Sequence, residues 1–463
     1  MTEAAPPDPG IDVIVLGAGP AGVPAALAAA EAGARVAVVD ANDAPGGQYH
    51  RQPADGLEVA RPGALHHGWR SAAAGFNALA DHPRIEHLAA TRAWLVEQRD
   101  GHVLVHTSGA VQATIRGRAL VLATGATERV LPFPGWDLPG VMTVGAAQAL
   151  VKGQGIRPGH RVLLAGTGPL LLAAASTLLA VGTRVAGVVD ANGPATWRPA
   201  VGAGLRTPGK VVEAGGYVAD LVRHGVPYRP SRAVIRVEGN DHVERAIVAR
   251  VDADWRVVEG TEEEHGVDAV CISYGFTPNV GVAAGLGCAL TDDLAVRTDP
   301  GQRTSVDRVF AAGEVSGIAG ASVAALEGEV AGAAAADRAG LTVDRARVRR
   351  QVRRRDRHRR AAEAVAAGAP IRDGWMTWLD DDTVVCRCEE VVFGAVRHAV
   401  TDLGACDVRS VKMTTRCGMG LCQAAICGPS VVDLVSQMTA GRPADAAGLT
   451  HRSITEAVPL GEL

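Results

Sequence analysis

Aromatic residues are scarce in this sequence: Phe, Trp and Tyr together make up 3% of its 463 residues. Lysine is rarer still, with three residues among the 46 basic ones, and the formal net charge at pH 7 is -4. A protein that binds nucleic acid usually presents a basic surface with aromatic rings for base stacking. We therefore expect no nucleic-acid partner.

Targeting signals are also lacking. Residues 1–10 contain no basic stretch and no apolar core, so we predict no secretory signal and expect a cytoplasmic protein. The uncharged run 162–183 is long enough to span a bilayer, but Gly166, Gly168 and Pro169 interrupt it. We interpret it as a strand, a turn and a buried helix, and predict no integral membrane span.

One pattern occurs twice, at residues 11–40 and 161–190. Each copy is an apolar strand, a glycine-rich turn, an Ala/Leu-rich helix and a second apolar strand that ends in an aspartate. This is the pattern of a βαβ unit of the Rossmann type. Further short apolar strands are expected at 118–125, 267–275 and 308–313, and we assign them to the first of two nucleotide-binding-type domains.

The first turn, Gly17-x-Gly19-x-x-Gly22, follows a predicted strand and opens a predicted helix. Its glycines permit a tight turn, a close approach of the backbone to a pyrophosphate and close packing of helix on strand, while the helix N-terminus favours phosphate. Asp40 is placed to bind a ribose diol.

The second turn, Gly166-x-Gly168, has Leu171 where the third glycine belongs. Leu171 would push helix and strand apart, so this site is degenerate. Asp190 would suit NAD(H); a purely structural domain, or one that binds another nucleotide, stays an equal alternative.

Two further motifs indicate that the first turn binds FAD and not NAD. Residues 45–49 (PGGQY) and 304–314 (TSVDRVFAAGE) resemble the two-dinucleotide-binding-domain flavoproteins, in which an early Gly-Gly loop lies beside the flavin and a late Gly-Asp contacts the ribityl chain. Here Glu314 replaces that Asp. The expected cofactor-binding residues are Gly17, Gly19, Pro20, Ala21, Gly22, Asp40, Gly47, Gln48, Ala123, Thr124, Gly125, Gly313 and Glu314, with Gly166, Gly168 and Asp190 at the second turn.

Cysteines cluster between Cys386 and Cys427, which in a reducing compartment favours a metal over disulfides. The Cys-x-Cys start and the later segment 417–427 (CGMGLCQAAIC) resemble the [2Fe–2S] module related to bacterioferritin-associated ferredoxin. The resemblance implies the ligands Cys386, Cys388, Cys422 and Cys427, with Cys417 surplus. Zinc and an empty site are the alternatives, and Cys-x-Cys is less usual for zinc than Cys-x-x-Cys.

Outside this cluster the sequence offers only the isolated Cys271 and Cys288. A disulfide reductase needs a cysteine pair beside the flavin, so we do not expect that activity. His50, His66 and His67 are the best candidates for a substrate base near the flavin loop, but packing or surface roles are the more ordinary interpretation.

Taken together with residues 123–136, these parts are similar over nearly the whole chain to the FAD-containing A (alpha) subunits of opine oxidases and hydrogen cyanide synthase. The resemblance implies a partner flavoprotein of the D-amino-acid-oxidase type, a small third subunit in some cases, FMN at a subunit interface in some cases, and electron relay to an acceptor. The alternatives are a stand-alone NADH-dependent flavin reductase and a non-catalytic redox sensor or scaffold.

The predicted fold class is α/β. Two Rossmann-like domains, the second inserted in the first, are followed by a small, mainly helical [2Fe–2S] domain. Residues 345–360 contain ten arginines, which indicates a solvated linker helix or, less commonly, a dock for an acidic partner. The expected boundaries are 8–150 and 269–340 for the FAD-binding domain, 151–268 for the inserted domain, 341–375 for the linker and 376–463 for the [2Fe–2S] domain.

Overall fold

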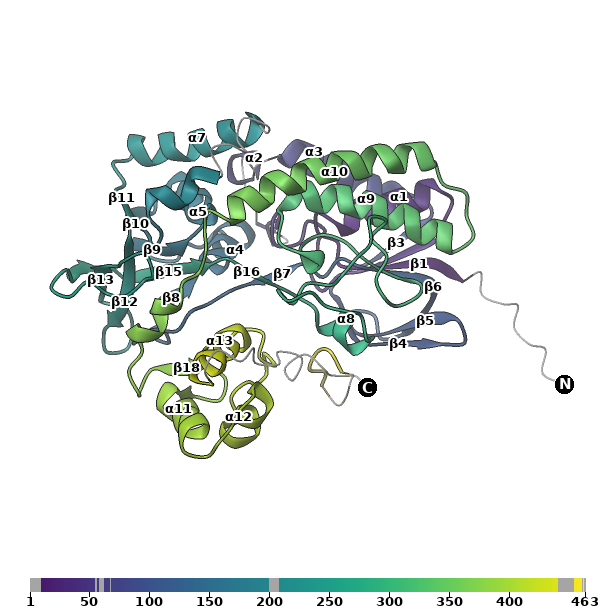
Figure 1. Cartoon of the computed structure of the whole chain (residues 1–463). Helices are drawn as coiled ribbons and strands as arrows, with labels where there is room; N and C mark the ends of the chain where they lie inside the picture. The colour runs from purple at the N-terminus through teal and green to yellow at the C-terminus, as the bar shows by residue number, and fades with distance from the viewer. Residues whose placement is uncertain are drawn as a thin grey trace.

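Two α/β units lie side by side, with a small helical module below them and one long helix across the top (Figure 1). This computed structural model describes residues 10–54, 56–57, 62–66, 68–199, 208–439, 454–459 and 461. The predicted fold class is confirmed: two Rossmann-like units precede a small C-terminal module.

The first sheet has seven strands in the order β3-β2-β1-β6-β5-β4, with β17 also paired to β6. The pairs β3-β2, β2-β1, β1-β6 and β6-β17 are parallel, and β6-β5 and β5-β4 are antiparallel. Its strands are β1 Ile11–Leu16, β2 Val36–Val39, β3 Ile85–Leu88, β4 Thr91–Arg99, β5 His102–Gly109, β6 Thr114–Leu122 and β17 Val309–Ala311.

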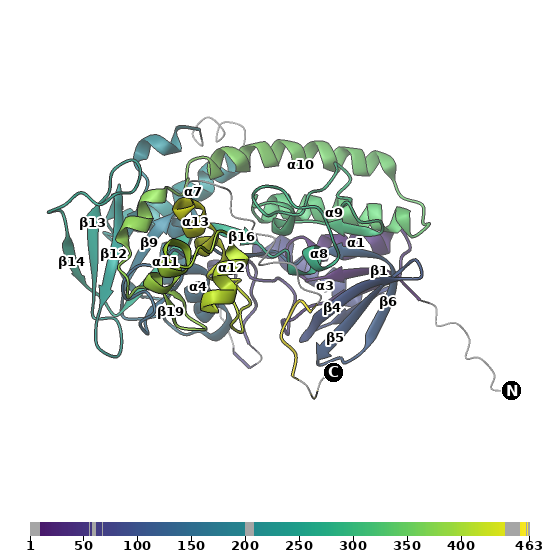
Figure 2. The ribbon, with the colours of Figure 1, turned by 60° about the horizontal axis from the view of Figure 1, so that its bottom comes forward.

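Alternate residues of β1 face opposite layers, as the period of two in a strand requires. Val13 and Val15 pack in a core with α1 and α9, whereas Ile14 and Leu16 pack in a core with α8. The long helix α10 lies on α9 (Figure 2). The helices of this unit are α1 Gly22–Glu31, α2 Pro62–Leu65, α3 Trp69–Asp81, α8 Gly281–Gly285, α9 Ala321–Arg338 and α10 Arg345–Ala366, with a 3-10 turn η2 at Glu314–Ser316.

The second sheet is fully parallel, in the order β11-β10-β9-β15-β8. Val162 and Leu164 of β9 face α4 and α5, and Leu163 and Ala165 face the opposite layer. A three-stranded antiparallel sheet, β12-β13-β14, lies in that layer. The elements are β8 Val141–Thr143, β9 Arg161–Thr167, β10 Arg184–Asp190, β11 Tyr228–Pro230, β12 Arg232–Glu238, β13 Arg245–Arg250, β14 Glu263–Gly266, β15 Ala269–Tyr274, α4 Val144–Gln154, α5 Leu170–Ala180, η1 Pro194–Trp197 and α7 Pro208–Arg223.

The assignment of the strand at 267–275 to the first domain is wrong. Strand β15 pairs with β9 and β8 in the second sheet. Strand β8 belongs to that sheet and α4 begins beside it, although both start before residue 151, the predicted start of the inserted domain. A buried parallel strand has the same apolar composition in either sheet, so the sequence pattern does not distinguish them. The chain passes between the two units through a two-stranded antiparallel ribbon, β7 Ala126–Glu128 with β16 Phe276–Pro278.

The C-terminal module contains β18 Val384–Cys386, β19 Val391–Val392, α11 Phe393–Thr401, α12 Val408–Thr415 and α13 Gly428–Met438, after a 3-10 turn η3 at Asp373–Trp378. Its interior is continuous with that of the second unit, because Val385, Val396 and Leu434 belong to the same buried cluster as Leu163 and Ile272. Residue Thr455, predicted to belong to the module, instead donates its backbone N–H to Trp94 O of β4 in the first unit.

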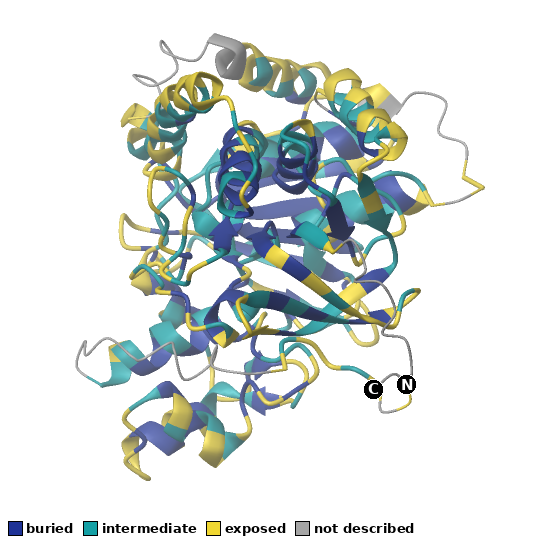
Figure 3. Cartoon of the chain, turned by 90° about the vertical axis from the view of Figure 1, so that its right-hand side faces the viewer, coloured by how far each residue is buried: buried dark blue, intermediate teal, exposed yellow. Residues whose placement is uncertain are grey.

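Buried residues concentrate in the two sheets and in the helices directly on them (Figure 3). The uncharged run 162–183 folds as β9, the glycine turn and α5, as predicted. Among the residues described, the chain has no helix both long and apolar enough to cross a bilayer.

Candidate functional site

The first glycine turn joins β1 to α1 and requires glycine at positions 17 and 22. A Cβ atom at position 17 would lie 2.6 Å from Ala123 O, and one at position 22 would lie 1.7 Å from Gly17 O. The first turn of α1 has no acidic residue, and its N-cap, Ala21, makes no side-chain capping bond in the described structure. The free N–H groups and the positive end of the helix dipole are therefore left for an anion such as pyrophosphate.

Asp40, at the end of β2, is 4% exposed. Its carboxylate accepts hydrogen bonds from the backbone N–H of Ala18 (2.8 Å) and from the backbone and side-chain nitrogens of Asn42 (2.9 Å each). Asp40 thus fixes the glycine turn itself. Asn42 was not predicted; an Asp side chain often accepts from the backbone N–H two residues on, but nothing in the sequence marks the side chain at position 42.

The other predicted flavin-site segments converge on this turn. Gly46 N–H donates to Ala18 O (2.8 Å), and a Cβ atom at position 47 would lie 3.0 Å from Gly19 Cα. A Cβ atom at position 313 would lie 2.8 Å from Ala21 Cβ. The glycine turn, the Gly46-Gly47 loop, residues 123–125 and the loop after β17 therefore meet at the carboxyl ends of the parallel strands, where α/β folds bind ligands. Gln48 lies at the edge and accepts a bond from Arg51.

Glu314 lies in η2, and burial raises its pKa above the usual range for a carboxyl group. A second buried carboxylate, Glu327 of α9, accepts hydrogen bonds from Gly313 N–H (2.9 Å) and Ser316 Oγ (3.2 Å). The sequence analysis missed Glu327 because no motif marks it within the Ala-rich helix.

The second glycine turn is covered by the chain's own residues. Gly166 is required, because a Cβ atom there would lie 1.8 Å from Ser273 O; a Cβ atom at Gly168 would contact Ala369 at 3.8 Å. Asp190 is 1% exposed, and its carboxylate accepts from Tyr228 Oη (2.6 Å) and Asn192 N–H (2.9 Å). Burial raises the pKa of Asp190.

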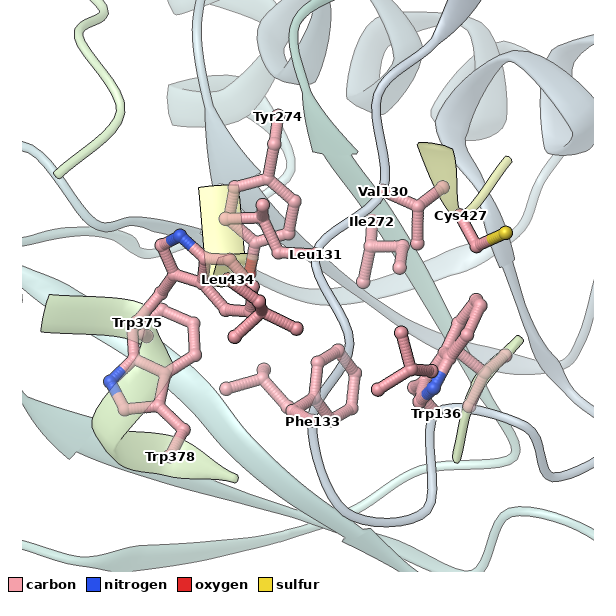
Figure 4. Packing of buried hydrophobic residues seen from close by; sticks show 14 of the residues in the cluster. Val130, Leu131, Phe133, Trp136, Ile272, Tyr274, Trp375, Trp378, Cys427 and Leu434 are labelled. Carbon is pink, nitrogen blue, oxygen red and sulfur yellow. The ribbon is translucent and has the colours of Figure 1, made fainter. Parts of the chain in front are cut away.

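Four cysteines line one cavity of about 130 Å³ between the module and the second unit: Cys386, Cys388, Cys422 and Cys427. These are the four predicted ligands. The opposite wall is apolar and comes from the second unit, with Val130, Trp136 and Ile272. Figure 4 shows these three residues beside Cys427 at one end of the shared core. Four thiolates at one cavity are the donor set that iron–sulfur clusters and zinc both accept.

Cys417 is close to this set, although it does not line the cavity. The sulfurs of Cys386, Cys417 and Cys427 lie within 4.8 Å of one another, and Cys417 is 1% exposed. Thiol hydrogen bonds from Cys417 and Cys427 lower the pKa of Cys386 below that of an ordinary thiol. Cys406 is exposed and outside both groups.

Polar contacts join the module to the second unit and to the segment after β7. Trp136 Nε1 donates to Val384 O, Ser430 Oγ donates to Val130 O (2.7 Å), and Arg129 pairs with Asp433. The guanidinium group of Arg387, between two of the cysteines, stacks 4.9 Å from the ring centroid of Trp136.

Two of the candidate bases, His50 and His66, pack among aromatic rings of the first unit, and His50 meets Phe76 edge-on with ring centroids 6.3 Å apart. His66 is 6% exposed and stacks on Trp69, with ring centroids 4.9 Å apart. Burial, reinforced by the charges of Lys152 and His50, lowers the pKa of His66 to about 4, so its ring is neutral at pH 7. His67 lies outside the described residues.

Cys271 and Cys288 do not form a dithiol pair. Both are buried in different cores and are free thiols. Burial raises the pKa of Cys271 to about 12 and also raises that of Cys288. Thiols of this kind are inert at neutral pH.

Residues 11–336 match the family described as pyridine nucleotide-disulphide oxidoreductase, and residues 384–437 match the BFD-like [2Fe-2S] binding domain. The A subunit of opine oxidase from Rhizobium meliloti is 33% identical over 98% of this chain and 87% of its own length. The chain belongs to the pyridine nucleotide-disulphide oxidoreductase family and, within it, to the relatives of the opine oxidase A subunit.

A second relative and one solved structure are also similar to this chain. Hydrogen cyanide synthase subunit HcnB of Pseudomonas protegens is 31% identical over 93% of this chain and 92% of its own length. The L-proline dehydrogenase of P. horikoshii has the same fold, with a TM-score of 0.67 at 21% identity, over 98% of this chain and 79% of that one. The chain is a flavin-dependent oxidoreductase, and FAD and a [2Fe–2S] cluster are its cofactors.

Proposed function

We propose that this chain is the electron-transferring FAD/[2Fe–2S] subunit of a heteromeric dehydrogenase that oxidises an amine, an opine or an amino acid. The observation that carries the proposal is the cavity at Cys386, Cys388, Cys422 and Cys427, which lies within the same rigidly packed chain as an FAD-type glycine turn. The relatives named as subunits of opine oxidase and of hydrogen cyanide synthase support the assignment to a complex.

The residues divide the work of holding two groups. Residues 17–22 would bind the FAD pyrophosphate at the N-terminus of α1, Gly46-Gly47 and 123–125 would border the flavin, and Gly313-Glu314 would face its ribityl chain. The four cavity cysteines would hold the cluster, with Cys417 behind them. FAD accepts electrons in pairs and the cluster carries them singly, so together they connect a two-electron donor to one-electron chemistry.

The inference of a partner rests on the relatives, which are named as subunits, and on the state of His66. His66 is neutral and buried, so we infer that amine oxidation occurs on a partner flavoprotein of the D-amino-acid-oxidase type. A small third subunit, FMN at a subunit interface and a cytoplasmic location remain predictions.

The coverage of the second glycine turn argues against a stand-alone NADH-dependent reductase. A Cβ atom at Gly168 would contact Ala369 at 3.8 Å, and the Asp190 carboxylate accepts from Tyr228 Oη (2.6 Å), a bond that Asp40 of the first turn does not have in the described structure. A nicotinamide dinucleotide would have to displace these contacts.

The decisive experiment compares the purified chain alone with the chain co-expressed and co-purified with a candidate partner flavoprotein of the amino-acid-oxidase type. Alone, it should contain FAD and iron but oxidise no amine; in the complex, an amine substrate should bleach the cluster absorbance at the turnover rate. Cys422→Ser should abolish cluster reduction, and Cys406→Ser, which alters an exposed cysteine away from the cavity, should not. Robust amine oxidation by the isolated chain, or cluster reduction by NADH alone, would refute the proposal.

A further inference from the structure

The arginine-rich helix α10 is not simply solvated. Two of its arginines, Arg355 and Arg359, point inward. Arg355 is 6% exposed and donates to Pro300 O and Gln302 Oε1 (2.9 Å each). Arg359, one turn further along, donates through Nε to Glu327 Oε1 of α9 (3.1 Å). The helix therefore reaches the interior of the first unit at two points.

Glu327 is 1% exposed and bonds in two directions. Its Oε1 faces Arg359, and its Oε2 accepts from Gly313 N–H (2.9 Å) and Ser316 Oγ (3.2 Å). A buried carboxylate is tolerated only when it is paired and hydrogen-bonded. The Arg359 guanidinium supplies the charge, and the loop after β17 supplies the remaining donors.

This loop lies directly on the glycine turn. A Cβ atom at Gly313 would be 2.8 Å from Ala21 Cβ, and one at Gly317 would be 3.1 Å from a guanidinium nitrogen of Arg359. The loop is thus packed between the N-terminus of α1 and α10, with Glu314 on it. A movement of Arg359 or Glu327 would change where Glu314 and Gly313 lie relative to the turn.

We propose that Glu327 and Arg359 are positioning residues for FAD, which hold the Gly313-Glu314 loop against the glycine turn without touching the cofactor. The inference rests on the proposed function, because it assumes that FAD occupies this turn. The composition of α10 alone does not suggest this role, in which an inward-facing arginine of the helix supports the flavin site.

The test is the rate of FAD release from the intact holo chain, followed by the recovery of flavin fluorescence after dilution. Arg359→Met should speed release at least tenfold. Arg359→Lys keeps the charge and should restore part of the slow release. The matched controls are Arg357→Met and Arg360→Met, neighbours in the same helix; Arg357 and Arg360 are exposed, and these variants should release FAD at the wild-type rate.

A double variant separates positioning from general destabilisation. In Arg359→Met the buried Glu327 loses its counter-charge, whereas Glu327→Gln removes that charge and can still accept from Gly313 N–H. The combination of the two should therefore release FAD more slowly than Arg359→Met alone. Ser316→Ala removes a hydroxyl that lies within hydrogen-bond distance of Gly313 O (2.8 Å) and Glu327 Oε2 (3.2 Å) but leaves the Arg359–Glu327 pair intact, and it provides a milder variant should Arg359→Met fail to fold.

The outcomes are distinct. If the wild-type chain binds no FAD, the proposed function and this inference both fail. If the wild type binds FAD and folded Arg359→Met releases it at the same rate, or if the Arg357 and Arg360 variants release it equally fast, only the positioning role is refuted.

Discussion

Replacement of Phe133 by Ala should loosen the module from the second unit. Phe133 is 0% exposed and lies in the core that both parts share, near Leu131 and Leu434 (Figure 4). Truncation of a fully buried Phe costs about 3–5 kcal/mol, because apolar contacts are lost and a cavity remains. That is a large fraction of the roughly 5–15 kcal/mol that stabilises a typical domain.

Urea unfolding measures this effect with two probes. Tryptophan fluorescence reports mainly on the shared core, because four of the seven tryptophans belong to it: Trp136, Trp255, Trp375 and Trp378. The visible absorbance of the cluster reports on the module. Both transitions should shift together to lower urea. Leu403→Ala, at a side chain that is 58% exposed on the module, should change stability by less than about 0.5 kcal/mol. A loss below about 1 kcal/mol in Phe133→Ala, or a shift in only one probe, would show that the two parts do not share a cooperative core.

Three further predictions concern single positions. Gly22→Ala should yield protein without FAD, read from the flavin absorbance of the purified chain, because its Cβ would lie 1.7 Å from Gly17 O; retention of full FAD would contradict this. The pKa of His66 is about 4 in the folded state and about 6.5 in the unfolded state. As the pH drops from 7.5, the unfolded chain therefore binds the proton first. The free energy of unfolding falls as the pH passes 6.5 and continues to fall toward pH 4. By pH 4.5 this group should cost about 2.5 kcal/mol, and urea titrations of His66→Gln should lack that part of the acid loss. Cys427→Ser should lose the cluster while Cys417→Ser keeps it, as measured by iron content and EPR of the reduced protein; the opposite pattern would exchange their roles.

The glycine turns and the cysteine module could be predicted because their requirements are local. The steric limit at Gly22 comes from Gly17 in the same turn, and the cysteines are chemically distinctive. The limit at Gly17 comes from the remote Ala123, but the glycine spacing of the turn marks that position as well. Their context, a strand before the turn and a helix after it, can also be read in the same short segment.

Other features depend on contacts that are remote in sequence. The pairing of β15 with β9 spans about a hundred residues, and apolar composition is the same in either sheet. The coverage of Gly168 by Ala369 and the pairing of Arg359 with Glu327 join segments that no motif connects. Cys417 was set aside on the family resemblance, yet its sulfur lies with those of Cys386 and Cys427, because α12 and the following turn bring it back to β18.

The ribbon of β7 and β16 carries the first two crossings of the chain between the two nucleotide units. Alone, such a joint would serve as a hinge, since few residues would have to change their backbone angles for the units to swing. Here α10 adds a second connection, because it packs on α9 of the first unit. The three residues 368–370 that follow it contact the second unit at Trp197, Gly168 and Asn192. Because the ribbon and the segment after α10 both connect the two units, the distance between the two redox centres should stay constant through each catalytic cycle. Electron transfer between them then does not require a hinge motion of the units.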